Sequence, residues 1–170
     1  MPEANQPPAP QHPLQTATWT TQVELTPGQY TTLIRLTTPH ECQTQTTRTL
    51  RTALESAALN RHNRRTTHLT DATIETAEYI LALNAVTKPS KEATLHLNRF
   101  RRTYQNQLSR QRLLSAQSEG AAIRERRTHK PATFQPRTEG DPKPWVVWEP
   151  DLNQEFRLPS QDCIATPTNH

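Results

Sequence analysis

A helical repeat of apolar residues in the first third of the chain is the sequence feature that most limits which folds the chain can adopt. The repeat occupies one face of a helix, with spacings of three and four residues. Its members are Leu50, Ala53, Leu54, Ala57 and Ala58. A polar, threonine-rich stretch that holds Arg48 comes directly before them. Residues 44–60 are therefore predicted to form an amphipathic helix that packs on a core and presents Arg48 from its first turn.

Three further helices are predicted from their start signals. Thr26-Pro27-Gly28-Gln29 supplies an N-cap threonine, a proline at the first helical position and the glutamine of a capping box. Thr70 caps a helix with an apolar face, and Ser90 caps a longer one over about residues 91–119. Four helices with short connectors predict an all-α fold, an antiparallel four-helix bundle.

Composition divides the chain into a core and two ends. Only 32% of the residues are apolar, and most of the 15 prolines lie near the two ends, which can bury little surface. We therefore expect a disordered arm over 1–15, a helical bundle over 16–127, and an extended Pro-rich C-terminal tail over 128–170. The aromatic residues of the tail are expected to pack on the bundle surface, with Trp145-Val146-Val147-Trp148 as a short strand or an anchor.

Positive charge is concentrated in the predicted bundle. Residues 48–130 hold 16 Lys and Arg against 7 Asp and Glu, and arginine supplies most of the positive charge. The planar guanidinium group suits bidentate contact with phosphate, so nucleic acid is the expected partner. Lysine and arginine that neutralise a nucleic-acid backbone give salt-sensitive binding without sequence preference. The candidate RNA-binding residues are Arg48, Arg61, Arg64, Arg65, Arg99, Arg101 and Arg102.

Signals for catalysis, metal binding and membrane insertion are lacking in the sequence. The chain has three glycines, so no phosphate-binding loop can be written, and its seven histidines are dispersed. Cys42 and Cys163 form no metal or redox motif, and whether they pair stays open. The expectation is a protein without enzymatic activity, cofactor, metal, small-molecule substrate or membrane partner, in a reducing compartment.

Several short elements resemble tobamovirus-like rod-shaped plant virus coat proteins. Trp19 and Val23-Glu24-Leu25 precede a short helix, and Gln43-Thr44-Gln45-x-x-Arg48-Thr49 opens the next one. Arg101-Arg102 early in the fourth helix, Phe134 and Val147-Trp148 stand at places comparable to those in that family. The chain departs from the family at the acidic pair after Arg-Arg, where Thr103-Tyr104 stands.

The resemblance implies a coat protein that assembles helically, in many copies, around single-stranded RNA. Its locations would be the virion and the host cytoplasm. Two alternatives remain open: a small basic non-capsid nucleic-acid-binding protein, such as a regulator or a silencing suppressor, and a helical interaction module whose arginines are merely solvated.

The resemblance further implies that carboxylates meet between subunits and make assembly depend on pH. Like charges held close favour protonation, so acid would favour the polymer. Glu75 and Glu78, close together on the third predicted helix, are the first candidates, and Glu149 and Asp151 are the second. The alternative interpretation is that all four are ordinary surface acids.

Overall fold

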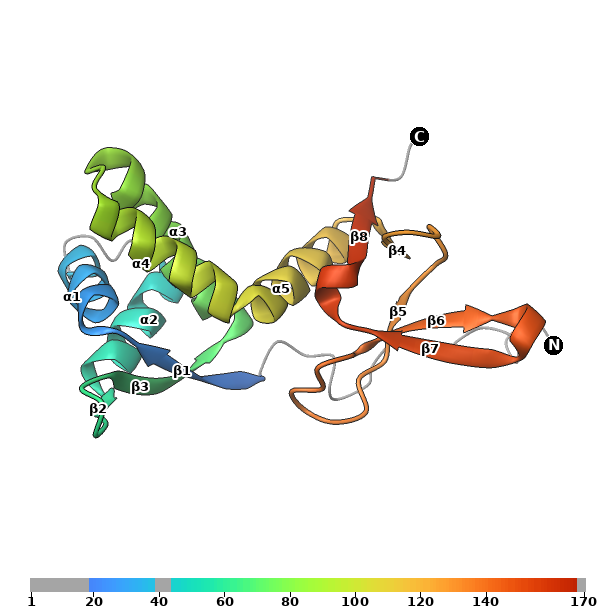
Figure 1. Ribbon diagram of the computed structural model, residues 1–170, viewed down its shortest axis with the longest axis horizontal. Coiled ribbons are helices and arrows are strands. Elements are labelled where there is room, and N and C mark those ends of the chain that lie inside the picture. Colours follow the sequence, from blue (N-terminus) through green and yellow to red (C-terminus); the bar gives the residue numbers. More distant parts are fainter. Residues whose placement is uncertain (1–18, 39–43, 168–170) are drawn as a thin grey trace.

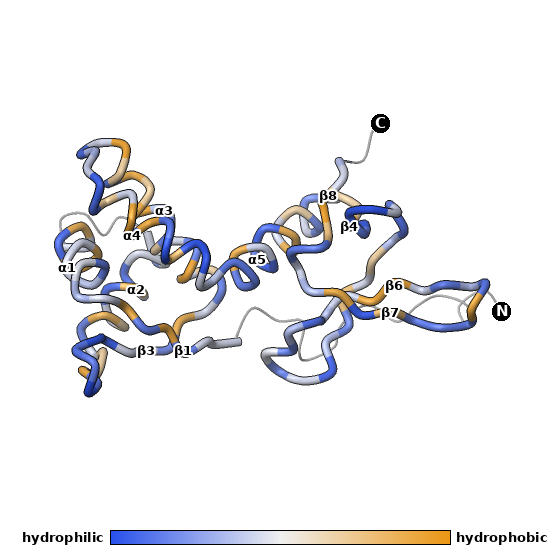
Figure 2. The backbone as a smooth tube through the Cα atoms, viewed as in Figure 1, coloured by the Kyte–Doolittle hydropathy of each residue, from blue (hydrophilic) through white to orange (hydrophobic). Residues whose placement is uncertain are grey.

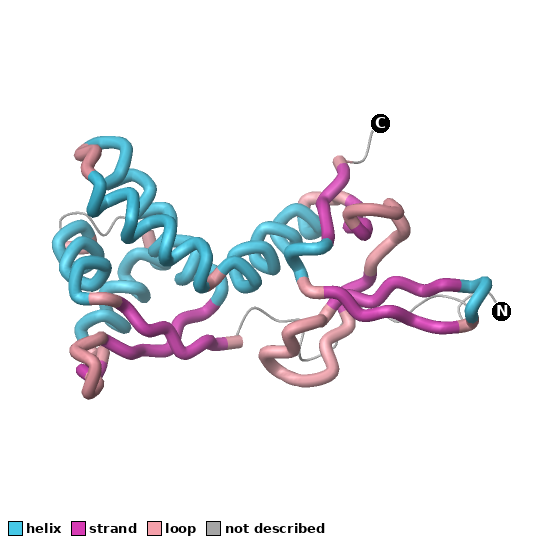
Figure 3. Tube along the Cα trace, in the orientation of Figure 1, coloured by secondary structure: helices cyan, strands magenta, loops and turns pink. Residues whose placement is uncertain are grey.

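The computed structural model describes residues 19–38 and 44–167, which form a mixed α and β fold (Figures 1 and 3). The all-α four-helix bundle predicted from the sequence is therefore wrong. The helices are α1 (Pro27–Leu36), α2 (Gln45–Glu55), α3 (Asp71–Thr87), α4 (Lys91–Thr103) and α5 (Gln105–Ser118), with short 3-10 helices η3 (Pro150–Leu152) and η4 (Ser160–Asp162). The strands are β1 (Thr20–Leu25), β2 (Ala58–Leu59), β3 (Arg65–Thr70), β4 (Ala122–Glu125), β5 (Thr133–Phe134), β6 (Trp145–Glu149), β7 (Gln154–Leu158) and β8 (Cys163–Thr166).

The strands form three small antiparallel sheets. The first has the order β1-β3-β2, with Thr20 opposite Thr70 and Leu25 opposite Arg65. The second pairs β4 with β8, and the third has the order β5-β6-β7. Val23 and Leu25 alternate with exposed residues along β1 and are fully buried. β1 and β3 are rich in threonine and other β-branched residues, which suits a pleated, half-buried surface and explains why no helix forms there.

The predicted starts of the helices are confirmed at their caps. The Thr26 side chain accepts from the Gln29 backbone while Gln29 accepts from the Thr26 N–H, which completes the capping box before α1. Thr44, Thr70 and Ser90 likewise accept from backbone N–H groups in the first turns of α2, α3 and α4. Caps depend on neighbouring residues alone, so the sequence predicts them well.

The second predicted helix ends at Glu55, five residues before Asn60. The chain then turns through residues 60–64, where the Asn60 carboxamide oxygen accepts from the backbone N–H groups of His62 and Arg64. Asn63 adopts a positive φ of 61° in this turn. The turn leads into β3, which runs back antiparallel to Ala58–Leu59, so these two residues form strand β2 where the last helical turn was predicted.

The fourth predicted helix is divided at Tyr104 into α4 and α5, which run in different directions (Figure 1). Tyr104 leaves the helical conformation, with φ −112° and ψ 25°. Its buried hydroxyl accepts from the Glu24 N–H at 2.8 Å and donates to the Glu24 carbonyl at 3.2 Å. This pair of hydrogen bonds ties the bend to β1, and burial raises the pKa of the phenol.

Apolar side chains gather in two cores. In Figure 2, segments coloured as hydrophobic occur both in the part with α1 to α4 and in the part with β4 to β8. The N-terminal core consists of Val23, Leu25, Leu33, Leu50, Leu54, Leu69, Ile74, Ala77, Ile80, Leu81, Leu97, Phe100, Tyr104 and Leu108. The C-terminal core consists of Trp19, Leu113, Ile123, Ala132, Phe134, Trp145, Val147 and Cys163. The tail therefore builds a core of its own, where the sequence led us to expect segments lying on a bundle. Helix α5 supplies one residue to the first core and one to the second.

A buried carboxylate organises the loop that precedes β6. Asp141 is 2% exposed and accepts from the Arg137 guanidinium at 3.2 Å, and from the backbone N–H groups of Arg137 and Lys143 at 2.9 Å. The Arg137 guanidinium and these backbone donors hold the pKa of the Asp141 carboxyl well below its usual range. Protonation of Asp141 in the folded chain therefore removes interactions that the ionised form makes.

Asp141 is expected to contribute stability that disappears in acid. Because its pKa is lower in the folded than in the unfolded chain, the contribution is complete above the unfolded pKa of about 3.9 and is lost as the pH falls toward the folded value. Urea midpoints of the wild type and Asp141→Asn should therefore differ at neutral pH and converge in acid. A difference that stays constant down to about pH 3 would contradict this role.

Candidate functional site

The seven arginines predicted to bind RNA do not share one surface. Arg48 is exposed on the first turn of α2 and donates to the Gln45 side chain at 3.1 Å. Arg61 is exposed in the turn before β3, and its Nε lies 3.4 Å from the His62 ring. Arg65 stacks on the Tyr30 ring, with 4.9 Å between the guanidinium carbon and the ring centroid. None of these three lines a hollow described below.

Arg64, Arg99 and Arg102 are brought together by the fold. They line one hollow of about 340 Å³ between β1, the start of α1 and the end of α4. Arg64 lies 3.7 Å from a Glu24 carboxylate oxygen, and both side chains are almost half exposed. Arg99 and Arg102 make no ion pair with any residue that the structure describes. Two guanidinium groups are thus left free to bind an external anion.

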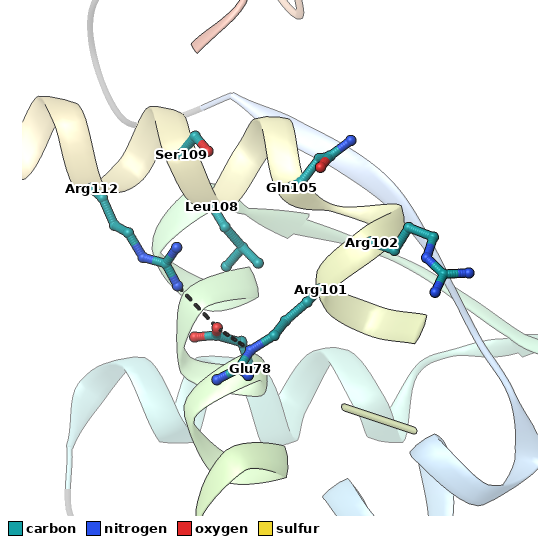
Figure 4. Close-up of a pocket in the computed structure, with 7 residues that line it drawn as sticks. All are labelled: Glu78, Arg101, Arg102, Gln105, Leu108, Ser109 and Arg112. Atoms are coloured by element: carbon teal, nitrogen blue, oxygen red, sulfur yellow. Dashed lines mark hydrogen bonds and ion pairs between the residues drawn. The ribbon is translucent and has the colours of Figure 1, made fainter. Parts of the chain in front are cut away.

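Arg101 and Arg112 converge on one carboxylate in a second, larger hollow. Figure 4 shows the two side chains approaching Glu78 of α3 from α4 and from α5, while Arg102 points away from it. The Arg101 Nε and the Arg112 Nη2 both lie 2.9 Å from the Glu78 Oε2. The hollow has a volume of about 610 Å³, and Gln105, Leu108 and Ser109 complete its lining.

The two hollows share one lining residue, Arg102. We call the combined surface the arginine corner. It consists of Arg64, Arg99, Arg101, Arg102 and Arg112. Glu24 and Glu78 supply the carboxylates within it, so five positive charges stand against two negative ones. The Arg101 and Arg112 side chains are 48% and 56% exposed, which leaves N–H groups on each that Glu78 does not engage.

Sequence reasoning did not select Arg112, Gln105 or Ser109 for the site. A signal for Arg112 was present, because Arg101 and Arg112 are eleven residues apart and eleven residues are close to three full helical turns. Positions at that spacing share a helical face. The bend at Tyr104 keeps both side chains directed at α3, which no periodicity along one helix predicts.

The predicted intersubunit carboxylates have varied surroundings. Glu78 is buried and neutralised by two arginines of the same chain, in place of the predicted exposed face with a like charge nearby. Glu75 is partly exposed and makes no ion pair among the described residues. Glu149 forms an ion pair with Lys130, whereas Asp151 is exposed on η3. Glu78 therefore organises the arginine corner.

Cys163 is a buried free cysteine of the C-terminal core. Burial raises the pKa of the Cys163 thiol to about 12, so the thiol is protonated and unreactive at neutral pH. Cys42, and with it any pairing of the two cysteines, lies outside the described residues, as does the arm over 1–15. The described residues include no cluster of His, Cys, Asp or Glu suited to a metal ion. Among their helices, none is both long and apolar enough to cross a bilayer.

Comparison of the chain with protein-family models, curated proteins and solved structures finds no match.

Proposed function

We propose that this protein binds single-stranded RNA through the arginine corner, as a small basic nucleic-acid-binding protein. The observation that carries the proposal is the excess of guanidinium groups on the surface where α4 meets α5. Guanidinium groups bind phosphate through paired N–H donors. An excess of them also attracts a polyanion at distances up to about the Debye length, which becomes shorter as the salt concentration rises.

The shape of the arginine corner favours a flexible strand over a duplex. The smaller hollow is lined by α4 up to Tyr104, and the larger hollow is lined by residues of both α4 and α5, across the bend. Duplex DNA has a persistence length of about 50 nm, so a duplex stays nearly straight over the surface of a small protein. A single strand can follow the bend and place successive phosphates in both hollows.

The arginine corner is suited to phosphate and not to the reading of bases. Tyr104 is the one aromatic residue among the described residues that line the hollows, and it is only 6% exposed. Base stacking requires an exposed ring. We therefore expect binding to be largely independent of RNA sequence and strongly weakened by salt.

The test compares two pairs of adjacent arginines that carry equal charge. Arg101→Gln with Arg102→Gln should weaken binding to a short single-stranded RNA about tenfold and reduce the dependence of log Kd on log salt by roughly 1.4, at about 0.7 per phosphate contact. The matched control, Arg126→Gln with Arg127→Gln, removes two exposed arginines beyond β4. Fluorescence anisotropy across a salt series measures both quantities. Equal losses of RNA affinity in the two variants would show that binding depends on net charge and not on the arginine corner. A wild type that does not bind RNA would refute the proposed function.

Replacement of Glu78 separates electrostatics from folding at the same site. Glu78→Gln removes the carboxylate that competes with phosphate for Arg101 and Arg112, so RNA should bind more tightly. The same change should lower the free energy of unfolding by about 1–2 kcal/mol, because hydrogen bonds to charged groups are lost at half-exposed arginines. Weaker RNA binding by a folded Glu78→Gln variant would contradict the proposed phosphate path.

A coat function is the second candidate, and one surface favours it. The outer face of α3 exposes Tyr79, Leu83 and Val86, which suits contact between copies. The antiparallel bundle predicted from the four helices is not the fold of this chain, so the arginine corner is the stronger ground for a function. Negative-stain microscopy of the protein with RNA distinguishes the two, since rods or stacked discs indicate a coat and small dispersed complexes do not.

A further inference from the structure

Helix α3 is apolar on two opposite faces. Its inner face supplies Ile74, Ala77 and Leu81 to the N-terminal core. The apolar residues of its outer face are spaced four and three residues apart, so they form one stripe. The stripe consists of Tyr79, Leu83 and Val86, with exposures of 63%, 49% and 75%. A helix with apolar side chains on two opposite faces can be covered by partners on both of them.

We propose that the α3 stripe binds the α3 stripe of a second copy of this chain, with the two helices antiparallel across a two-fold axis. The stripe is centred near Leu83, with Tyr79 four residues before it and Val86 three residues after it. A two-fold axis through this region places Tyr79 of each copy against Val86 of the other. An isologous contact of this kind uses the same patch on both subunits and closes at two copies.

Charges at the two ends of the stripe match this arrangement. Glu75 lies one helical turn before Tyr79, Lys88 is the C-cap residue of α3 shortly after Val86, and Lys91 is the first residue of α4. None of the three makes an ion pair with another described residue. Antiparallel pairing brings Glu75 of one copy opposite the lysines of the other, at both ends. Parallel pairing would set like charges against each other, which is unfavourable.

The area of the stripe is sufficient for a weak, specific dimer. With about 200 Å² for a tyrosine side chain and about 150 Å² for each aliphatic one, the exposed parts come to roughly 300 Å² per copy. Two copies then bury on the order of 600 Å² of apolar surface. This is close to the apolar share, slightly over half, of an interface of about 1,200 Å², the lower end for a stable complex. We therefore expect a dimer that dissociates on dilution.

The test is analytical ultracentrifugation of the full chain over a concentration series without RNA, so it is independent of the proposed RNA binding. The wild type should move from monomer toward dimer as its concentration rises. Leu83→Asp should remain monomeric, because it places a charge at the centre of the contact. The matched control is Leu152→Asp, which changes a leucine of η3 that is 60% exposed and should dimerise as the wild type does. Far-UV circular dichroism checks that each variant is folded.

A charge reversal tests the orientation of the helices. Glu75→Lys should weaken the dimer by placing three positive charges at each end, and the added pair Lys88→Glu with Lys91→Glu should restore it. A wild type that stays monomeric throughout would overturn the proposal, as would equal effects of Leu83→Asp and Leu152→Asp. If adding Lys88→Glu and Lys91→Glu to Glu75→Lys does not restore the dimer, the antiparallel arrangement is wrong.

Discussion

Asp71→Ala is expected to lower the free energy of unfolding by about 3–5 kcal/mol, because it leaves the Arg110 guanidinium buried without its partner. The Arg110 Nε and Nη2 lie 2.5 and 2.8 Å from the two Asp71 carboxylate oxygens, and both side chains are less than 10% exposed. The pair joins the first turn of α3 to α5, and the Trp19 ring covers the guanidinium at 4.8 Å. Among the described residues, Asp71 is the carboxylate that pairs with Arg110.

Chemical denaturation followed by circular dichroism measures this loss. The control is Glu55→Ala, which breaks the exposed Arg51–Glu55 pair of α2 and should change stability by at most about 0.5 kcal/mol. Replacing both partners, as in Asp71→Leu with Arg110→Met, should recover much of the loss, since no buried charge remains. A single Asp71→Ala variant as stable as Glu55→Ala would show that Arg110 finds other compensation.

Trp145→Ala should cost about 3–5 kcal/mol and act mainly on the C-terminal core. The Trp145 side chain is fully buried, its Nε1–H donates to the Ser160 hydroxyl at 2.9 Å, and its ring lies 5.1 Å from the Phe134 ring. Among the described residues that core has eight buried members, so loss of one of its two tryptophan side chains leaves a cavity that few neighbours can fill.

Limited proteolysis with mass spectrometry locates the effect of this change. Cleavage is expected to rise within residues 120–167 of Trp145→Ala, while the helices of the N-terminal core stay protected. Trp148→Ala is the matched control, since Trp148 lies on the same strand but is 51% exposed. Uniform cleavage along the whole Trp145→Ala chain would indicate that the two cores unfold as one unit.

Structural features that depend on neighbouring residues could be predicted from the sequence, whereas features that depend on contacts between distant residues could not. Capping at Thr26, Thr70 and Ser90 involves groups within three residues, so the helix starts were found. The β1–β3 ladder joins residues 40 to 50 positions apart, and only β1 shows a short alternation of buried and exposed residues. No local pattern shows that β1 meets β3, and without that pairing the helices alone resemble a bundle.

The candidate site divides in the same way. Arg101 and Arg102 were found because adjacent arginines on an amphipathic helix stand out, and Arg99 and Arg64 were found from charge density. The role of Glu78 was not predicted, because helical spacing placed Glu78 on the exposed face of its helix. In the structure, the bend at Tyr104 brings Arg101 and Arg112 onto its carboxylate. Burial of a carboxylate between helices follows from the angle at which they meet, which the sequence does not state.

The hydrogen bonds between Tyr104 and Glu24 join residues 80 positions apart and fix the angle between α4 and α5 before any ligand arrives. A surface that is already in its binding shape loses little conformational entropy when a ligand docks. On binding, the single-stranded RNA then loses more conformational entropy than the protein does. Encounter with a preorganised basic surface is governed by electrostatic steering, so salt should act on the association rate more than on the lifetime of the complex.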